Sequence, residues 1–166
     1  MRILIADDDD FCRKLLEDTL FGWGHEAVSC SDGAEAWERF QEEDAPKLAI
    51  LDWMMPGLEG PEVCRKVREL PHAGGIYILL LTSLERKDKI VEGLEAGADD
   101  YVVKPFDRNE MKARIQVGQR IVELHERTLE AERDRVLAQT AGAAAHLINQ
   151  PLTVILGNVE LLMNWT

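Results

Sequence analysis

Residues 48–60 read LAILDWMMPGLEG, a short apolar run that ends in an aspartate and continues into a loop. Residues 48–51 have the length and composition of a strand that is buried on both faces of a sheet. Asp52 follows this strand directly, and we expect Trp53 and Met55 to pack around the loop. The stretch therefore predicts a carboxylate at the carboxyl end of a buried strand.

Strand-like and helix-like segments alternate on both sides of this stretch. Strand-like runs lie at residues 3–5, 26–30, 48–51, 76–81 and 101–103. Between them, residues recur at helical spacing at Phe11, Leu15, Leu16 and Thr19, at Ala36, Trp37 and Phe40, at Val63, Val67 and Leu70, and at Ile90, Val91 and Leu94. Because parallel strands need crossover connections, this alternation predicts an α/β fold with a doubly wound, five-stranded parallel sheet.

Polar residues and glycines mark the ends of the predicted elements. Asp9 or Asp10 is placed to cap the first helix, and the other of the two should face water. Asp32-Gly33 predicts a turn, and Gly97 should end the fourth helix.

Composition excludes several classes of protein. The chain has 166 residues, which suffice for one domain and an appendage, and it contains no apolar run long enough to span a membrane. Its start lacks the features of a signal peptide, so we expect a cytoplasmic protein without membrane contact. A net charge of −12 disfavours direct binding of nucleic acid. Three widely spaced cysteines argue against a disulfide framework or a zinc site, and each should be buried.

Polar residues with complementary chemistry follow four of the predicted strands. Asp7 and Asp8 follow the first strand, Asp52 the third, Thr82 the fourth and Lys104 the fifth. In a doubly wound sheet these ends converge on one edge, where ligands bind.

The chemistry expected of such a cluster is phosphoryl transfer. Mg²⁺ offsets the repulsion between clustered carboxylates, and a carboxylate such as Asp52 can attack phosphorus to form an acyl phosphate. Lys104 would supply a second cation, and the Thr82 hydroxyl a hydrogen bond. Each residue also has an ordinary alternative: a run of aspartates can be a solvated turn, and Lys104 a surface lysine. The combination in this order favours the site.

Four segments, ILIADDD, LAILDWMMPGLEG, LLLTS and GADDYVVKPF, resemble the CheY-like receiver domains of two-component response regulators. The resemblance covers residues 1 to about 122 and implies a flavodoxin-like sheet of order 2-1-3-4-5. It also implies a Mg²⁺-dependent site and a histidine kinase or phosphotransfer protein as partner. The roles that it implies are metal binding by Asp7, Asp8, Asp52 and the Met54 carbonyl, phosphoacceptor chemistry at Asp52, phosphate binding by Lys104, switching by Thr82 and Tyr101, and a cis Lys104-Pro105 bond.

From Asp107 the sequence predicts one long helix, so that residues 1–122 form the receiver domain and residues 123–166 a helical extension. Val122, Leu129, Val136 and Ala143 recur at every seventh position, which indicates a coiled coil and a homodimer. The companion positions His125, Glu132 and Gln139 are polar, so the register is poorly specified.

Residues 142–163 resemble the phosphoacceptor helix of a histidine kinase dimerisation domain, with His146 as a possible second phosphoacceptor. Leu147 stands where that family has an acidic residue, and nothing resembles a nucleotide-binding domain, so independent kinase activity is not expected. An inert helix histidine is the alternative. The abrupt end of this segment leads us to expect an incomplete piece of a longer protein.

Two functions remain in view. The first is a switch of a phosphorelay that catalyses its own phosphorylation and dephosphorylation at Asp52 and relays the change to a dimeric output. The alternative is the receiver-bearing N-terminal part of a sensor histidine kinase, phosphorylated on His146. An ordinary transcriptional regulator is disfavoured because no helix-turn-helix or basic segment follows the receiver.

Overall fold

The computed structural model describes residues 1–83 and 87–163, and it describes the surroundings of side chains for residues 1–83 and 89–143. The chain divides into two units, Met1–His125 and Glu126–Thr166. The first unit contains the sheet and the helices around it, and the second contains the later part of helix α5. No helix in the described ranges is long and apolar enough to cross a membrane.

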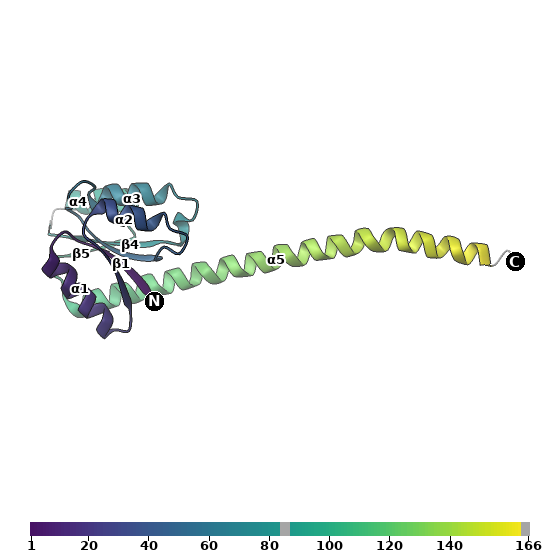
Figure 1. The fold of residues 1–166 in the computed structure, drawn as a ribbon, viewed down its shortest axis with the longest axis horizontal. Helices are drawn as coiled ribbons and strands as arrows, with labels where there is room; N and C mark the ends of the chain where they lie inside the picture. The colour runs from purple at the N-terminus through teal and green to yellow at the C-terminus, as the bar shows by residue number, and fades with distance from the viewer. Residues whose placement is uncertain (84–86, 164–166) are drawn as a thin grey trace. The chain divides into compact units, whose positions relative to one another are not determined.

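The first unit is a five-stranded parallel sheet with helices on both faces (Figure 1). The strands are β1 (Arg2–Ala6), β2 (Glu26–Cys30), β3 (Leu48–Asp52), β4 (Tyr77–Thr82) and β5 (Asp100–Val103), in the order β2-β1-β3-β4-β5. The helices are α1 (Asp10–Gly22), α2 (Gly33–Phe40), α3 (Gly60–Arg68), the short η1 (Ala73–Gly75), α4 (Lys87–Glu95) and α5 (Arg108–Met163). The predicted fold class and strand order are confirmed.

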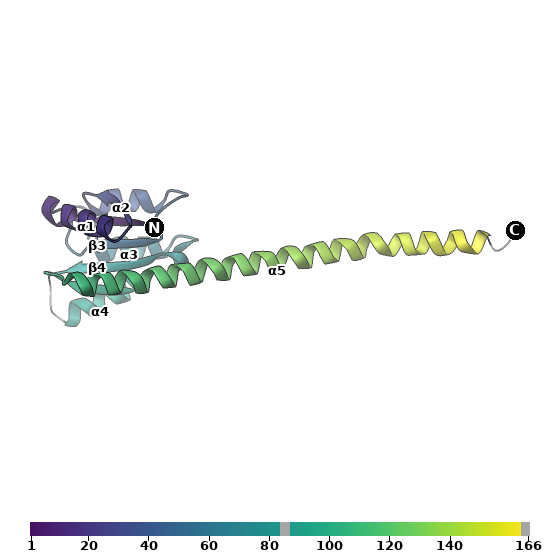
Figure 2. The same ribbon diagram turned by 90° about the horizontal axis from the view of Figure 1, so that it is seen from below.

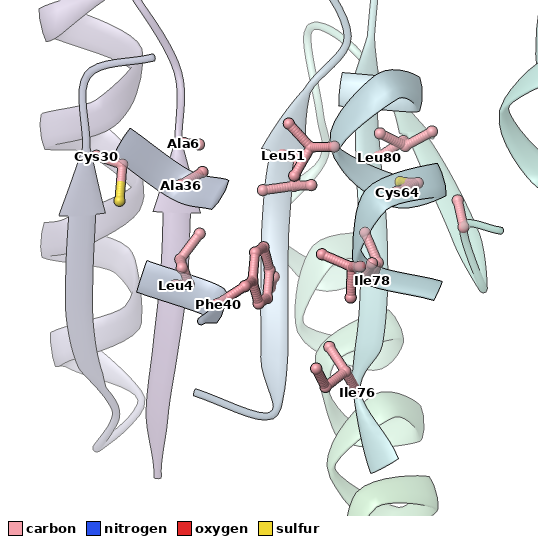
Figure 3. Packing of buried hydrophobic residues seen from close by; sticks show 14 of the residues in the cluster. Leu4, Ala6, Cys30, Ala36, Phe40, Leu51, Cys64, Ile76, Ile78 and Leu80 are labelled. Carbon is pink, nitrogen blue, oxygen red and sulfur yellow. The ribbon is translucent and has the colours of Figure 1, made fainter. Parts of the chain in front are cut away.

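Two apolar clusters hold the layers together, one on each face of the sheet. Helices α2 and α3 and the end of α4 pack on one face, whereas α1 and the first turns of α5 pack on the other (Figures 1 and 2). Figure 3 shows the first cluster, in which Phe40 of α2 lies beside Leu4 of β1. Strands β3 and β4 are buried along their whole length, which explains their almost continuous apolar sequences.

Helix starts follow the local sequence closely. Asp9 caps α1 by accepting hydrogen bonds from the amides of Phe11 and Cys12, so the expected cap is confirmed. Asp32 caps α2 through the amide of Glu35 at 2.8 Å. Asp32 lies in a bend, in line with the predicted turn, whereas Gly33 is already the first residue of the helix.

Gly60 fixes the loop that follows Asp52. A Cβ atom at Gly60 would lie 2.4 Å from the carbonyl oxygen of Asp52, so no side chain fits there. The Gly60 amide donates to the carbonyl of Trp53 at 2.9 Å. The start of α3 is thus pressed against the end of β3, which holds the loop close to the carboxylate.

Several predicted helix positions face solvent. On α1, Phe11 and Leu15 are exposed, whereas Leu16 and Thr19 are buried as predicted, together with Leu20. On α4, Val91 and Leu94 are exposed, and Gly93 faces the sheet. The helical spacing identified the buried sides of α2 and α3, where Ala36, Phe40, Val63 and Val67 are buried as predicted, but only part of that of α1 and not that of α4.

The first position of the predicted heptad pattern along α5 does not belong to a coiled coil. Val122 is buried in the cluster formed with α1, so it belongs to the first unit and not to the seam of a coiled coil. Leu129 and Val136, which follow at the same spacing, are 47% and 54% exposed. Any apolar seam on this helix therefore starts after Val122.

Candidate functional site

The sheet register brings the ends of four strands to one edge. Ala6 pairs with Leu51, and Asp52 pairs with Leu81, so that Asp7 and Asp52 emerge at the same level. Thr82 pairs with Val103, the residue before Lys104. The Lys104 amide donates to the Thr82 carbonyl at 2.7 Å, which ties the ends of β4 and β5 together.

Three carboxylates gather at this edge. Asp7, Asp8 and Asp52 each offer an oxygen atom, and these atoms lie within 4.8 Å of one another. Asp7 is fully buried, Asp52 is 7% exposed and Asp8 is exposed. Carboxylate oxygens are the ligands that Mg²⁺ prefers, and the exposed side of the cluster leaves room for the waters that Mg²⁺ retains. The donor set therefore fits a hard divalent cation.

Lys104 binds two of the three carboxylates. Its Nζ lies 2.6 Å from Oδ1 of Asp52 and 2.8 Å from Oδ2 of Asp7. The other oxygen of Asp52, Oδ2, accepts a hydrogen bond from the Met54 amide at 3.1 Å. The Lys104-Pro105 peptide bond is cis. One ammonium group thus bridges two aspartates that come from different strands.

Burial and pairing act in opposite directions on these groups. Burial raises the pKa of Asp52, and the hydrogen bond and charge of Lys104 only partly offset this effect, so the net shift is upward. For Lys104, burial alone would lower the pKa, but the hydrogen bonds that its ammonium donates to Asp52 and Asp7 raise the pKa above its usual value. The ion pair favours the charged form of both groups. It outweighs the effect of burial on the pKa of Lys104 but not on the pKa of Asp52.

Trp53 and Met55 pack beside the site as expected. They are 4% and 7% exposed and belong to the apolar cluster under α2 and α3. The Trp53 amide donates to the Leu81 carbonyl at 2.8 Å. The loop after Asp52 is therefore anchored to the sheet on its apolar side.

Thr82 and Tyr101 occupy neighbouring strands. Thr82 is completely buried at the end of β4. Tyr101 is half-buried and packs against the same apolar cluster as Trp53, with its backbone paired to Leu80.

The loop between β1 and α1 holds two residues that the sequence reasoning missed. The guanidinium of Arg13 donates to the carbonyl oxygen of Asp7 at 2.7 Å and forms an ion pair with Asp10. The Cys12 thiol is hydrogen-bonded to Asp7, and burial followed by this bond raises its pKa to about 12. The basic residue within the first turn of α1, directly after an acidic run, was the available signal for Arg13.

The three cysteines are free. Cys30 and Cys64 are buried apolar residues as predicted, and Cys12 is half-buried next to Asp7. His146 lies outside the residues whose side chains the structure describes, as does most of the segment that resembles a kinase helix.

Comparison with known proteins gives a consistent result for the first unit. A family model described as the response regulator receiver domain matches residues 3–116. The phosphate regulon transcriptional regulatory protein PhoB of Rhizobium meliloti is 41% identical over 115 residues, which are 69% of this chain and 50% of that protein. The chain thus spans about half the length of the curated relatives that it matches.

Solved structures show the same fold. The chemotaxis response regulator CheY4 of Vibrio cholerae superposes with a TM-score of 0.66 at 30% identity, over 70% of this chain and 97% of that one. The receiver domain of a signal transduction histidine kinase from Syntrophus aciditrophicus gives a TM-score of 0.65 at 30% identity, over 74% and 89% of the two chains.

Proposed function

Since the chain belongs to the response regulator receiver domain family, we propose that it is a phosphorylation-dependent switch in which Asp52 accepts a phosphoryl group with the help of Mg²⁺. The observation that carries this proposal is the position of the Lys104 ammonium, 2.6 Å from Asp52 beside a cluster of three carboxylates. Two-component signalling is the setting that the family supplies.

Asp7, Asp8 and Asp52 would hold the metal ion, with the backbone carbonyl of Met54 as a further ligand. The ion supplies positive charge beside the transferring group, which carries its negative charge on the equatorial oxygens. Without such a cation, three carboxylates so close together would repel an incoming phosphate.

In the transfer step, a carboxylate oxygen of Asp52 attacks the phosphorus atom of a phosphohistidine on a partner kinase or phosphotransfer protein. The new P–O bond forms as the P–N bond breaks, and the imidazole of the donor leaves with the bonding electron pair. The Lys104 ammonium stabilises an oxygen of the transferring group, and the Thr82 hydroxyl donates to another. Movement of Thr82 toward the phosphoryl group would then allow the Tyr101 ring to reorient.

Incubation with acetyl phosphate and Mg²⁺ tests the proposal without a partner protein. Intact-mass measurement should show one added phosphoryl group on the wild-type chain and none on Asp52→Asn. Asp18→Asn is the matched control, because Asp18 is an exposed residue of α1 that pairs with Lys14. Labelling of Asp52→Asn to the level of the control would refute the assignment.

The output proposal concerns the second unit. Leu129, Val136 and Leu137 are 47%, 54% and 67% exposed, and they lie within one sector of the helix. We expect a second copy of the chain to cover them in a homodimer. Sedimentation analysis should show that Val136→Glu weakens self-association, whereas Ala138→Glu, on the opposite side of the helix, should not. Equal behaviour of the two variants would contradict the dimer.

A second candidate is the front part of a histidine kinase, the class of protein from which the Syntrophus aciditrophicus receiver structure comes. The curated relatives do not favour it, because they are transcriptional regulators and a response regulator. Adding a separate kinase catalytic domain with ATP tests it: acid-labile phosphate on His146, lost in His146→Gln, would support the kinase, and an unlabelled His146 would remove it.

A further inference from the structure

Arg13 places a positive charge next to a cluster that is suited to a cation. Its Nη1 donates to the carbonyl oxygen of Asp7 at 2.7 Å, and its Nη2 pairs with the Asp10 carboxylate. The side chain is only 18% exposed, so the guanidinium lies along the loop and does not extend into solvent. Arg13 therefore joins the first and last residues of the loop that carries the acidic run.

The rest of the loop is held by hydrogen bonds from two backbone amides. The Asp9 amide donates to Oδ1 of Asp7 at 2.9 Å, and the Arg13 amide donates to the Asp9 carbonyl at 2.9 Å. Asp8 lies between these anchors, and within the described residues nothing donates a hydrogen bond to its carboxylate. The position of the Asp8 carboxylate thus depends on the conformation of the loop that carries it.

Charge alone would make Arg13 unfavourable for cation binding. Like charges repel, so removing a nearby positive charge should make a cation site bind more tightly. Loss of a group that orients the ligands has the opposite effect and typically weakens metal binding about 10–100-fold. The two effects therefore differ in sign, and an experiment can separate them.

We propose that Arg13 is a positioning residue for the metal site: its guanidinium fixes the Asp7–Asp10 loop so that the Asp8 carboxylate stays within reach of Asp7 and Asp52. This inference rests on the proposed Mg²⁺-dependent function. It extends that function by giving Arg13, a positively charged residue of α1, a role in binding the metal ion.

The test is a Mg²⁺ titration of the whole chain, followed by isothermal calorimetry, for the wild type, Arg13→Gln, Arg13→Lys and Lys14→Gln. Arg13→Gln should bind about tenfold more weakly despite its lost positive charge. Arg13→Lys keeps the charge but not the two-pronged geometry, so its affinity should be intermediate. Lys14→Gln removes a charge from the same helix, where Lys14 pairs with Glu17 and Asp18, and should bind as tightly as the wild type or slightly more tightly.

Two further measurements separate positioning from charge and from general loss of fold. The difference between the wild type and Arg13→Gln should persist when the ionic strength is raised, because salt screens a charge effect. Amide hydrogen exchange without metal should quicken at Asp9 in Arg13→Gln and remain unchanged in β3 and β4.

The outcomes distinguish the positioning role of Arg13 from the proposed Mg²⁺-dependent function. Mg²⁺ binding by Arg13→Gln that equals or exceeds that of the wild type would overturn the positioning role and leave the proposed function standing. A folded wild-type chain that binds no Mg²⁺ would overturn both.

Discussion

The ammonium group of Lys104 contacts the carboxylates of both Asp52 and Asp7, at 2.6 and 2.8 Å. The lysine comes from the end of β5, whereas the two aspartates come from the ends of β3 and β1. The contact therefore spans three strands that are not all neighbours in the sheet. It holds two like charges together before any phosphate or metal ion is added.

Replacing Lys104 by Met should destabilise the metal-free protein. Asp7 and Asp52 would lose, in a largely buried place, the group that donates hydrogen bonds to both, and such a loss typically costs roughly 1–3 kcal/mol. Mg²⁺ should then restore more stability to Lys104→Met than it adds to the wild type. Urea unfolding with and without Mg²⁺ measures both effects, and Lys14→Met serves as the control at an exposed lysine. Equal metal-free stability of Lys104→Met and the wild type would contradict this view of the pair.

The raised pKa of Asp52 predicts how stability depends on pH. In the unfolded chain the pKa of Asp52 is near 3.8. The folded protein holds the proton more tightly, because burial disfavours the charged carboxylate. The contribution of Asp52 to stability is therefore fully present below that value and is lost as the pH rises through the folded pKa.

Asp52→Asn removes the ionisable carboxyl group, so the variant should not lose this stability as the pH rises. Without metal, the variant should be more stable than the wild type at pH 7, and the difference should shrink toward pH 3. Urea unfolding across this range in the presence of a chelator measures it. A variant that is less stable than the wild type at pH 7 would show that the ion pair with Lys104 outweighs burial.

Two glycines of α5 should respond to alanine with opposite signs. A Cβ atom at Gly118 would lie 2.5 Å from Cδ1 of Tyr77, and overpacking of this kind costs about 1–3 kcal/mol. At Gly142, apart from the adjacent residues and the surrounding helix backbone, no heavy atom lies within 4 Å of the same position, and alanine there should favour the helix by about 1 kcal/mol. Unfolding followed by tryptophan fluorescence tests Gly118→Ala, and far-ultraviolet circular dichroism tests Gly142→Ala. A Gly118→Ala variant as stable as the wild type would contradict the close packing.

The strands and their polar ends could be read from the sequence because both depend on local patterns. A continuous apolar run such as that of β3 has one reasonable place, the interior of a parallel sheet. The residue that follows it then lies at the carboxyl edge whatever the details of the helices. This is why Asp52 and Lys104 could be expected to meet although 51 residues separate them.

The buried side of α4 could not be read in the same way. Its apolar residues Val91 and Leu94 face outward, while Gly93 faces inward because the Trp53 ring and Leu80 occupy the space where a side chain would lie. Hydropathy favours the larger residues for the inner face, and only the packing reveals that the small one is needed there.

The burial of Val122 in the receiver core and the contact of Arg13 with the Asp7 carbonyl were missed for related reasons. Val122 fits a heptad and a receiver core equally well by sequence, and the choice depends on how far α5 stays on the sheet. Arg13 donates to a backbone carbonyl, and its position after the acidic run indicates a nearby basic group without specifying that contact. Both features depend on tertiary geometry.

The most direct test of the account is to locate the phosphoryl group. The wild-type chain is phosphorylated with acetyl phosphate and Mg²⁺, the acyl phosphate is reduced with borohydride, and the modified residue is mapped by peptide mass spectrometry. The account predicts reduction at Asp52, dependent on Mg²⁺ and diminished in Lys104→Met. Modification at Asp7 or Asp8 in its place, or a chain that stays unmodified although folded, would contradict it.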